Sequence, residues 1–265
     1  MKRFVCAAAV IAVGICSVIS FGGCKEGEAY VEYKLSESGD YYIVSGVSGD
    51  KRGLKSYEVP AEYSAAEGES ALPVKEIGYE AFFQCTNLSW VTIPDSVEII
   101  GERAFAQCRF SKFTIPEGVK EIRRGAFGLC EALTEITVPA SVEVLAYQAF
   151  YCCSSLEKAV VKADITDLTA QVFYNTVAAQ GGNVYTNSSL SKVYLPATVQ
   201  KIDASALYGN FLTDIYFEGT PEQWNAVSFY ERTLKEGTEN EYEEKEVEKS
   251  SALPGGVNFH YDEKF

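Results

Sequence analysis

Histidine and basic residues are scarce in this chain of 265 residues. It has one histidine, His260, and 23 lysines and arginines against 37 aspartates and glutamates, for a formal net charge of −14. Nucleic acid is a disfavoured partner, because binding to phosphates needs a basic footprint. A Ser-His-Asp or Cys-His catalytic arrangement would have to use His260, and no serine or cysteine stands in an activating context near it.

Motifs for phosphates, dinucleotides and metals are lacking as well. The sequence contains no Walker-type loop and no GxGxxG fingerprint, and Gly181-Gly182 is better explained as a flexible turn. It has no C-x2-C pair of the kind that builds zinc sites, and its one histidine is remote from the cysteines. We therefore expect no metal and no cofactor, and an enzyme is the least favoured class of function.

The N-terminal residues have the pattern expected of a targeting signal. Lys2 and Arg3 precede an apolar run from Phe4 to Phe21, as in a secretory signal peptide, with a membrane-spanning helix as the alternative. The run ends in FGGC at residues 21–24, which resembles the lipobox of bacterial lipoproteins. This resemblance implies a signal peptide over 1–23, a lipid on Cys24 and an exported protein anchored at the bacterial cell envelope or surface. A plain signal peptide or a membrane anchor remains the alternative.

A repeat of 22 to 23 residues dominates the rest of the chain. It is visible in LSWVTIPDSVEIIGERAFAQC at 88–108, FSKFTIPEGVKEIRRGAFGLC at 110–130 and LTEITVPASVEVLAYQAFYCC at 133–153. Phenylalanines follow one another at spacings of 23, 22, 23 and 23 residues, at Phe82, Phe105, Phe127, Phe150 and Phe173. A repeat of this length predicts a stacked architecture in which neighbouring units share one core.

Each repeat combines two kinds of apolar spacing. Val91 and Ile93 alternate with Thr92, which predicts a short strand with one buried face, and Pro94 ends that strand. In the second half of the unit, apolar residues follow the spacing of a single helical stripe, at Ile100, Ala104, Phe105 and Cys108. Each unit is therefore predicted to be a strand, a corner and one to two helical turns.

The consensus LxxVxIPxSVxxIGxxAFxxC resembles the leucine-rich repeat of the BspA-like, treponemal-type bacterial surface proteins, over residues 54–217. The resemblance implies an α/β repeat fold, a right-handed solenoid of about seven rungs of 22–23 residues. In such a fold, short parallel strands line the concave face and short helical turns lie opposite. The family association further implies adhesion to extracellular or host matrix proteins.

Segments outside the repeat are predicted to anchor or cap it. We expect an anchor and linker over 24–30, an N-terminal β-hairpin cap over 31–53, the solenoid over 54–217 and a C-terminal cap over 218–265. Thr220, Pro221 and Gln223 occupy the positions that a helix start favours, so Trp224 would cover the last rung. We also expect a final strand at 257–261, a charged, solvated loop at 239–251, and extra residues looped out within 177–189.

One cysteine per repeat follows the phenylalanine, at Cys85, Cys108, Cys130 and Cys153. Equivalent side chains on stacked rungs point the same way, with Cβ atoms farther apart than the ~3.8 Å that a disulfide prefers. The column continues at Thr176 and Asn210, so we expect a structural role for these thiols. Cys152 lies off the column and is predicted to be the exposed or reactive thiol.

The outward positions of the strands form the candidate ligand face. Its leading residues are Trp90, Thr92, Lys112, Thr114, Glu135, Thr137, Lys158, Lys192, Tyr194 and Tyr216, with Ser56, Glu58, Val160 and Asp214 beside them. The favoured function is a lipid-anchored surface module that recognises an extracellular or host protein through this face. Binding of a surface glycan is the alternative, since Tyr194 and Tyr216 lie on consecutive rungs. The alternative to both is that this face is an ordinary solvated sheet surface that binds no ligand.

Overall fold

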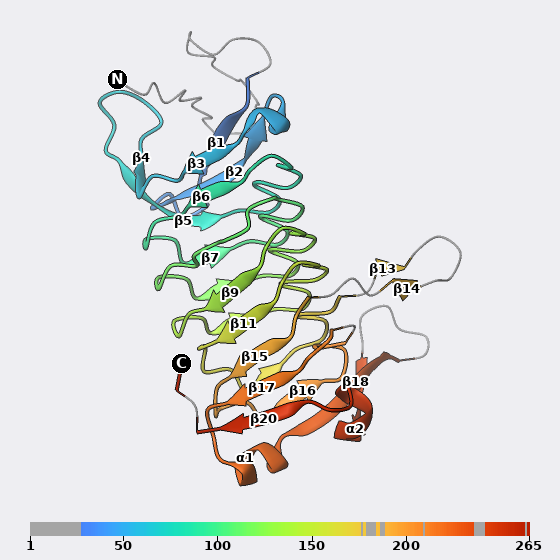
Figure 1. The fold of residues 1–265 in the computed structure, drawn as a ribbon. Coiled ribbons are helices and arrows are strands. Elements are labelled where there is room, and N and C mark those ends of the chain that lie inside the picture. The colour runs from blue at the N-terminus through green and yellow to red at the C-terminus, as the bar shows by residue number, and fades with distance from the viewer. Residues whose placement is uncertain are drawn as a thin grey trace.

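The computed structural model describes residues 28–175, 177–178, 184–185, 189–208, 210–235, 242–262 and 264–265. These residues form an elongated stack of coils around one continuous apolar core (Figure 1). Short strands run along two sides of the stack, and parallel pairing joins each coil to the next. The predicted repeat fold with short parallel strands is confirmed.

One side of the stack carries the strands predicted from the V-x-I segments, which we call the first sheet. β3 (Ser56–Glu58) pairs in parallel with β6 (Trp90–Thr92). Farther along, five parallel strands follow one another: β9 (Glu135–Val138), β11 (Lys158–Val161), β15 (Lys192–Leu195), β17 (Asp214–Phe217) and β20 (Asn258–Tyr261). Burial alternates along β9, so every second side chain faces away from the core.

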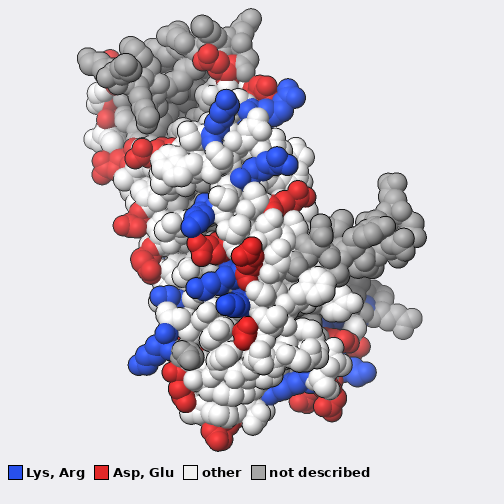
Figure 2. Space-filling model, viewed as in Figure 1, with Lys and Arg blue, Asp and Glu red and all other residues white. Residues whose placement is uncertain are grey.

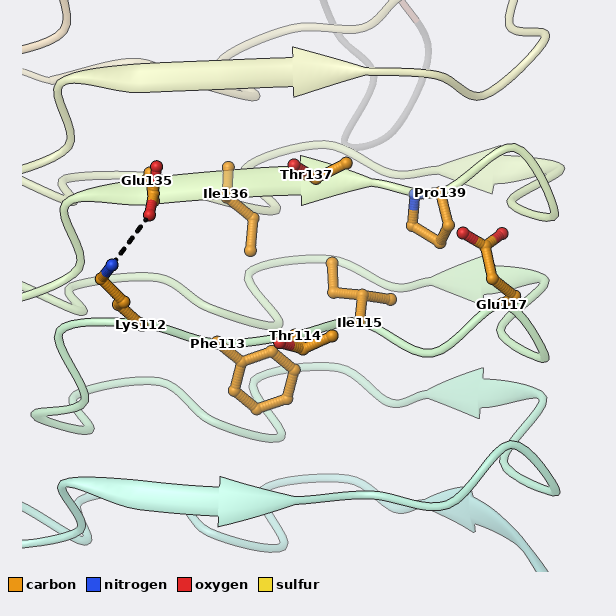
Figure 3. Close-up of a pocket in the computed structure, with 9 residues that line it drawn as sticks. All are labelled: Lys112, Phe113, Thr114, Ile115, Glu117, Glu135, Ile136, Thr137 and Pro139. Atoms are coloured by element: carbon orange, nitrogen blue, oxygen red, sulfur yellow. Dashed lines mark ion pairs between the residues drawn. The ribbon is translucent and has the colours of Figure 1, made fainter. Parts of the chain in front are cut away.

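The other side of the stack carries a second set of strands that the sequence pattern did not predict (Figure 3). Ile100 was assigned to a helical stripe, but it lies on β7 and is fully buried. The parallel strands of this side are β5 (Leu72–Ile77), β7 (Ile99–Ile100), β8 (Glu121–Ile122) and β10 (Val144–Leu145), then β12 (Asp167–Leu168), β16 (Lys201–Asp203) and β18 (Ser228–Leu234).

Tight turns replace the predicted helical turns. In the repeat at 88–108, Ala104 N donates to Gly101 O (3.2 Å) and Cys108 N donates to Phe105 O (3.2 Å), which closes turns of four residues. A residue with positive φ breaks the helical path in this segment, as at Gln107 (φ 63°). Phe105 N donates instead to Ala126 O of the next coil (2.8 Å), so this part of the backbone also hydrogen-bonds from coil to coil.

The predicted phenylalanine column is confirmed. All five rings are buried, and successive ring centroids are 5.2, 5.4, 5.3 and 5.5 Å apart with nearly parallel planes. Leu207 is buried at the equivalent position of a later coil. Burial of aromatic area on this scale makes the column a main source of stability for the stack.

The four cysteines of the column are buried in the core, and three of their thiols have a hydrogen-bond partner. The thiols of Cys108, Cys130 and Cys153 each lie 3.2 Å from a phenylalanine carbonyl oxygen of the preceding coil. Asn210 continues the pattern by donating to Phe173 O (2.7 Å), and Asn175 donates to Cys153 O (3.4 Å). Thr176, which we expected in this column, lies outside the described residues.

The prediction that Cys152 is exposed is wrong. Its relative exposure is 2%, and its backbone has φ 53°. Cys152 occupies the left-handed turn position that Gln84, Gln107 and Leu129 occupy in earlier coils. Those three side chains are more exposed, whereas this cysteine is enclosed by its surroundings.

The N-terminal end is capped by the predicted hairpin. β1 (Tyr30–Leu35) and β2 (Tyr42–Ser48) pair antiparallel, and β2 continues in parallel to β5. A 3-10 turn, η1 (Lys51–Gly53), follows the hairpin. The insertion that splits the first repeat contributes β4 (Glu62–Tyr63), which pairs antiparallel with β5. Tyr63 stacks on Tyr33 with a centroid distance of 4.1 Å, which ties the insertion to the hairpin.

The C-terminal cap begins with the predicted helix, α1 (Pro221–Ala226). Thr220 Oγ1 accepts from Gln223 N (3.3 Å), and Gln223 Oε1 accepts from Thr220 N (2.8 Å), which completes a capping box. Trp224 is buried against Phe217, with ring centroids 5.3 Å apart, and so covers the last coil as expected. The final strand expected at 257–261 is β20.

The described part of segment 239–251 is not the loop that its charge pattern predicted. It contains β19 (Tyr242–Val247), which pairs antiparallel with β18, and the short helix α2 (Lys249–Ala252). The side chains of β19 are mostly exposed, so the charges face solvent from a strand. Within the insertion at 177–189, β13 (Val177–Ala178) pairs with β14 (Val184–Tyr185) and projects from the stack (Figure 1).

The signal peptide at 1–23 and the proposed lipidation residue Cys24 lie outside the described residues. In the part of the chain that is described, no helix has both the length and the apolar character needed to cross a bilayer.

Candidate binding face

The outward side chains of the first sheet, including the segment 112–115 that lies between β6 and β9, form what we call the first-sheet face. Trp90 stands on it with 49% of its surface exposed. Most predicted ligand-face residues are exposed there, namely Thr92, Lys112, Thr114, Glu135, Thr137 and Lys192. Lys158, Tyr194, Asp214 and Tyr216 are half-buried on the same face. The structure therefore brings these residues together on one surface.

Val160 was predicted to face outward with them, and its register partners Thr137 and Tyr194 place it on that side of the sheet, but it is buried rather than exposed. It is 7% exposed, because β11 departs from strict alternation and buries three residues in succession. Its register partner on β15 is Tyr194, a large side chain on the same side of the sheet. The apolar valine is thus removed from solvent, and Lys158 is the residue of β11 whose charged group a ligand can reach.

A hollow of about 280 Å³ opens in the middle of this face (Figure 3). Sheet pairing is weakest here, since segment 112–115 meets β9 through one isolated bridge, Lys112 with Glu135. The floor and walls combine apolar and polar side chains: Phe113, Ile115, Ile136 and Pro139 with Lys112, Thr114, Glu117, Glu135 and Thr137. Such a mixture suits contact with a polypeptide surface.

An ion pair marks one end of the hollow. Lys112 Nζ lies 3.2 Å from Glu135 Oε1, and the two side chains are 77% and 54% exposed. A pair with this exposure contributes little to folding stability. Both groups remain accessible from outside, and they set a defined pattern of charge at the hollow.

Toward the C-terminal end, the face carries a ladder of aromatic rings. Tyr194 and Tyr216 stack at 4.2 Å with planes 4° apart, and Tyr216 stacks on His260 at 4.3 Å with planes 11° apart. Sequence reasoning placed His260 in the cap and missed this role. The signal was available, because aligning the final strand at 257–261 with the strand at 213–217 puts His260 opposite Tyr216.

Hydrogen bonds fix the end of this ladder. His260 Nε2 lies 2.8 Å from Asp214 Oδ1, and Thr213 Oγ1 donates to Asp214 Oδ2 at 2.7 Å. The hydrogen bonds from His260 and then Thr213 hold the pKa of Asp214 below its usual value. The carboxylate therefore stays charged and orients the imidazole ring.

The described residues offer little for catalysis. His260 pairs with Asp214, and burial raises the pKa of the Cys108 and Cys153 thiols well above the ordinary value, so these thiols keep their protons. Among the residues that the structure describes, no group of three or more His, Cys, Asp or Glu side chains is placed to hold a metal ion. The arrangement is suited to binding through a preformed surface.

Charge is distributed in both signs over the side of the molecule that carries the first sheet. Figure 2 shows lysines and arginines interspersed with acidic residues along the stack. This pattern contrasts with the strongly acidic composition of the whole chain. A mixed surface of this kind favours selection of a partner by local charge complementarity.

Known proteins resemble this chain in sequence and in structure. A family model, "BspA type Leucine rich repeat region", matches residues 69–180 and 176–236 in six copies. No curated protein matches the sequence. A leucine-rich repeat protein of T. pallidum superposes with a TM-score of 0.57 and 28% identity, over 70% of this chain and 78% of that one.

Two further structures are similar. A leucine-rich repeat protein of Bacteroides ovatus gives 23% identity and a TM-score of 0.49, over 74% of this chain and 55% of that one. The pneumococcal vaccine antigen PcpA gives 14% identity and a TM-score of 0.57, over 84% of this chain and 44% of that one, and so shares the fold alone. With the repeat motif, the stacked coils and the family model in agreement, the chain belongs to the BspA-type leucine-rich repeat family.

Proposed function

We propose that this protein is an exported, lipid-anchored binding module. Through its first-sheet face it recognises an extracellular protein of a host or of a neighbouring cell. The exposed side chains of that face on a rigid stack carry the proposal, since Trp90, the hollow at Lys112–Pro139 and the aromatic ladder lie along one surface. BspA-type leucine-rich repeat proteins are typically exported surface proteins and generally non-enzymatic binding modules.

The stack supports this function physically. Each coil is held by parallel strand pairing and by buried phenylalanines, so the outward side chains are preorganised before a partner arrives. Preorganisation lowers the entropy lost on binding. Exposed tryptophan and tyrosine are also the side chains that dominate many protein interfaces.

Binding of a surface glycan is the second candidate, and Trp90 is the observation that favours it. A sugar ring stacks on an open aromatic face, and Trp90 has half of its surface accessible. Tyr194 and Tyr216, the residues that first suggested a glycan, have their facing rings stacked on each other at 4.2 Å. They therefore support the glycan alternative less than their positions in the sequence implied.

A binding screen tests the proposal. The purified protein is presented to arrays of extracellular proteins and of glycans, beside the variants Trp90→Ala and Thr137→Lys. Tyr242→Ala is the matched control, because Tyr242 is an exposed aromatic residue on β19, away from the first sheet. We expect protein ligands whose binding falls in both face variants and not in the control. Ligands that respond only to Tyr242→Ala would contradict the proposal.

The anchor is tested separately through Cys24. Cys24→Ser should abolish lipid labelling and release the protein from the membrane fraction or leave it unprocessed, because acyl chains supply ~0.8 kcal/mol per buried methylene. A chain that fractionates with membranes unchanged and takes up no lipid label in either form would contradict the lipid anchor. The outcome is independent of which face binds the partner.

A further inference from the structure

Two lysines of neighbouring strands lie in directly opposite positions on the first sheet. Lys158 on β11 and Lys192 on β15 are register partners, and like charges in directly opposite positions destabilise a sheet. Among the ion pairs of the described residues, neither lysine takes part, whereas Lys112 on the same face pairs with Glu135.

The acids closest in register to these lysines already have other partners. Glu135 lies opposite Lys158, and its carboxylate is paired with Lys112 at 3.2 Å. Asp214 lies opposite Lys192, and its carboxylate is engaged by His260 and Thr213. The two ammonium groups thus form a local site of positive charge in a chain with a net charge of −14.

Lys158 is held in place by an aromatic ring. Its Nζ lies 4.9 Å from the ring centroid of Tyr194, a cation–π contact that restrains a side chain with many rotamers. Tyr194 is in turn stacked on Tyr216 and touched edge-on by Phe265, with centroids 5.1 Å apart. The ammonium group is therefore positioned before a ligand binds.

The aromatic ladder selects for negative charge as well. Tyr194, Tyr216 and His260 use ring faces to stack on one another, so what this part of the sheet offers a ligand is the ring edges and phenol groups that Phe265 does not cover. The edge of an aromatic ring is the positive end of its quadrupole. A carboxylate gains from this arrangement, while a neutral sugar finds few open ring faces here.

We propose that Lys158 and Lys192, with the edges of Tyr194 and Tyr216, form a subsite for carboxylate side chains of an acidic segment in a partner protein. This inference rests on the proposed function and adds the chemistry of the partner and the part of the face that it occupies. The carboxylates supply a counter-charge through charge-assisted hydrogen bonds to the two ammonium groups.

The test uses the full chain and a labelled hexaglutamate peptide, measured by fluorescence anisotropy at about 0.15 M salt, where long-range repulsion by the acidic chain is screened. We expect binding of hexaglutamate and not of hexaglutamine. Lys158→Gln/Lys192→Gln should weaken binding about tenfold or more, and Lys158→Arg/Lys192→Arg should retain it. The control Lys55→Gln/Lys245→Gln makes the same change in charge at two exposed lysines elsewhere, and should leave affinity within about twofold.

Three results of the peptide experiment would overturn the inference. The first is failure of the wild-type chain to bind hexaglutamate. The second is an equal loss of affinity for hexaglutamate in the Lys158/Lys192 and Lys55/Lys245 variants. The third is lysine-dependent binding of an oligogalacturonate that is tighter than binding of hexaglutamate, which would assign the subsite to acidic glycans. The proposed function is tested separately from this inference about the subsite. If a protein ligand from the screen depends on Trp90 and is indifferent to both lysines, the proposed function stands and the acidic-segment subsite fails.

Discussion

The thiol of Cys130 donates a hydrogen bond to the carbonyl oxygen of Phe105, 3.2 Å away in the preceding coil. That oxygen also accepts the backbone N–H of Cys108, so the thiol adds a link between coils to a turn that is already closed. Asn210 makes the same kind of bond to Phe173. The position therefore favours a small side chain that can donate, which explains why asparagine replaces cysteine there in a later coil.

Two substitutions of Cys130 separate the contribution of its hydrogen bond to stability from the contribution of its packing. Cys130→Ala removes the donor and a buried sulfur atom, and we expect a loss of about 1–2 kcal/mol in the free energy of unfolding. Cys130→Ser keeps a donor and should lose less. Urea denaturation followed by circular dichroism measures both. If serine proved as damaging as alanine, the hydrogen bond would not be what this position requires.

The phenylalanine column predicts a larger effect in the middle of the stack. Phe127 is fully buried, and its ring centroid is within 5.4 Å of those of both Phe105 and Phe150. Phe127→Ala should cost ~3–5 kcal/mol, the sum of lost burial and a residual cavity. Phe211→Ala is the control, because Phe211 is 60% exposed and its loss should change stability by less than about 0.5 kcal/mol. A loss below about 1 kcal/mol at Phe127 would argue against a shared core.

Asp203 predicts a dependence of stability on pH. Burial raises the pKa of this carboxyl group, and its Oδ2 has no hydrogen-bond partner among the described residues, while Oδ1 accepts from Ser205 N at 2.8 Å. Because the folded-state pKa lies above the unfolded value, stability from Asp203 is fully present below the unfolded pKa and is lost as pH rises through the folded pKa.

Asp203→Asn stays neutral at every pH and keeps an acceptor for Ser205. We expect it to raise the free energy of unfolding by about 1 kcal/mol near neutral pH, with the gain shrinking as the pH falls toward the ordinary carboxyl pKa. Thermal melts of both proteins across this range check the trend. A difference that stays constant or grows on acidification would contradict it.

Alkylation tests the correction at Cys152. Burial raises the pKa of Cys85 to about 11, and Cys108, Cys152 and Cys153 are all buried, so the folded chain should resist iodoacetamide at these sites. Peptide mass spectrometry should find them labelled only after denaturant is added. Rapid, selective labelling of Cys152 in the folded protein would restore the earlier prediction of a reactive thiol.

Much of this fold was predictable because equivalent residues of successive repeats lie in the same environment, so the pattern recurs many times in the sequence. The spacing of Phe82, Phe105 and Phe127 located the core, and the alternation around Thr92 located the first sheet. Local chemistry was equally informative at the C-terminal cap, where Thr220 and Gln223 form the expected capping box. Both patterns depend on contacts that are short-range in sequence or periodic along it.

The second set of strands and the aromatic ladder were harder to predict. The apolar spacing from Ile100 to Cys108 fits a helical stripe, and the left-handed backbone at Arg103 and at Gln107 turns it into closed turns. A glutamine carries no clear signal for that conformation. Similarly, the stacking of His260 on Tyr216 depends on β20 returning to the sheet after a cap of about forty residues, so it can be predicted only by aligning two strands that lie far apart in the sequence.

Hydroxyl-radical footprinting of the protein with a ligand from the extracellular screen most directly tests whether the first-sheet face is the binding surface. It compares two aromatic residues of that face, the exposed Trp90 and the half-buried Tyr216, with the exposed Tyr79 and Tyr208 on the turns. We predict that bound ligand lowers oxidation at Trp90 or Tyr216 and leaves Tyr79 and Tyr208 unchanged. Protection confined to Tyr79 and Tyr208 would contradict the assignment of the binding face.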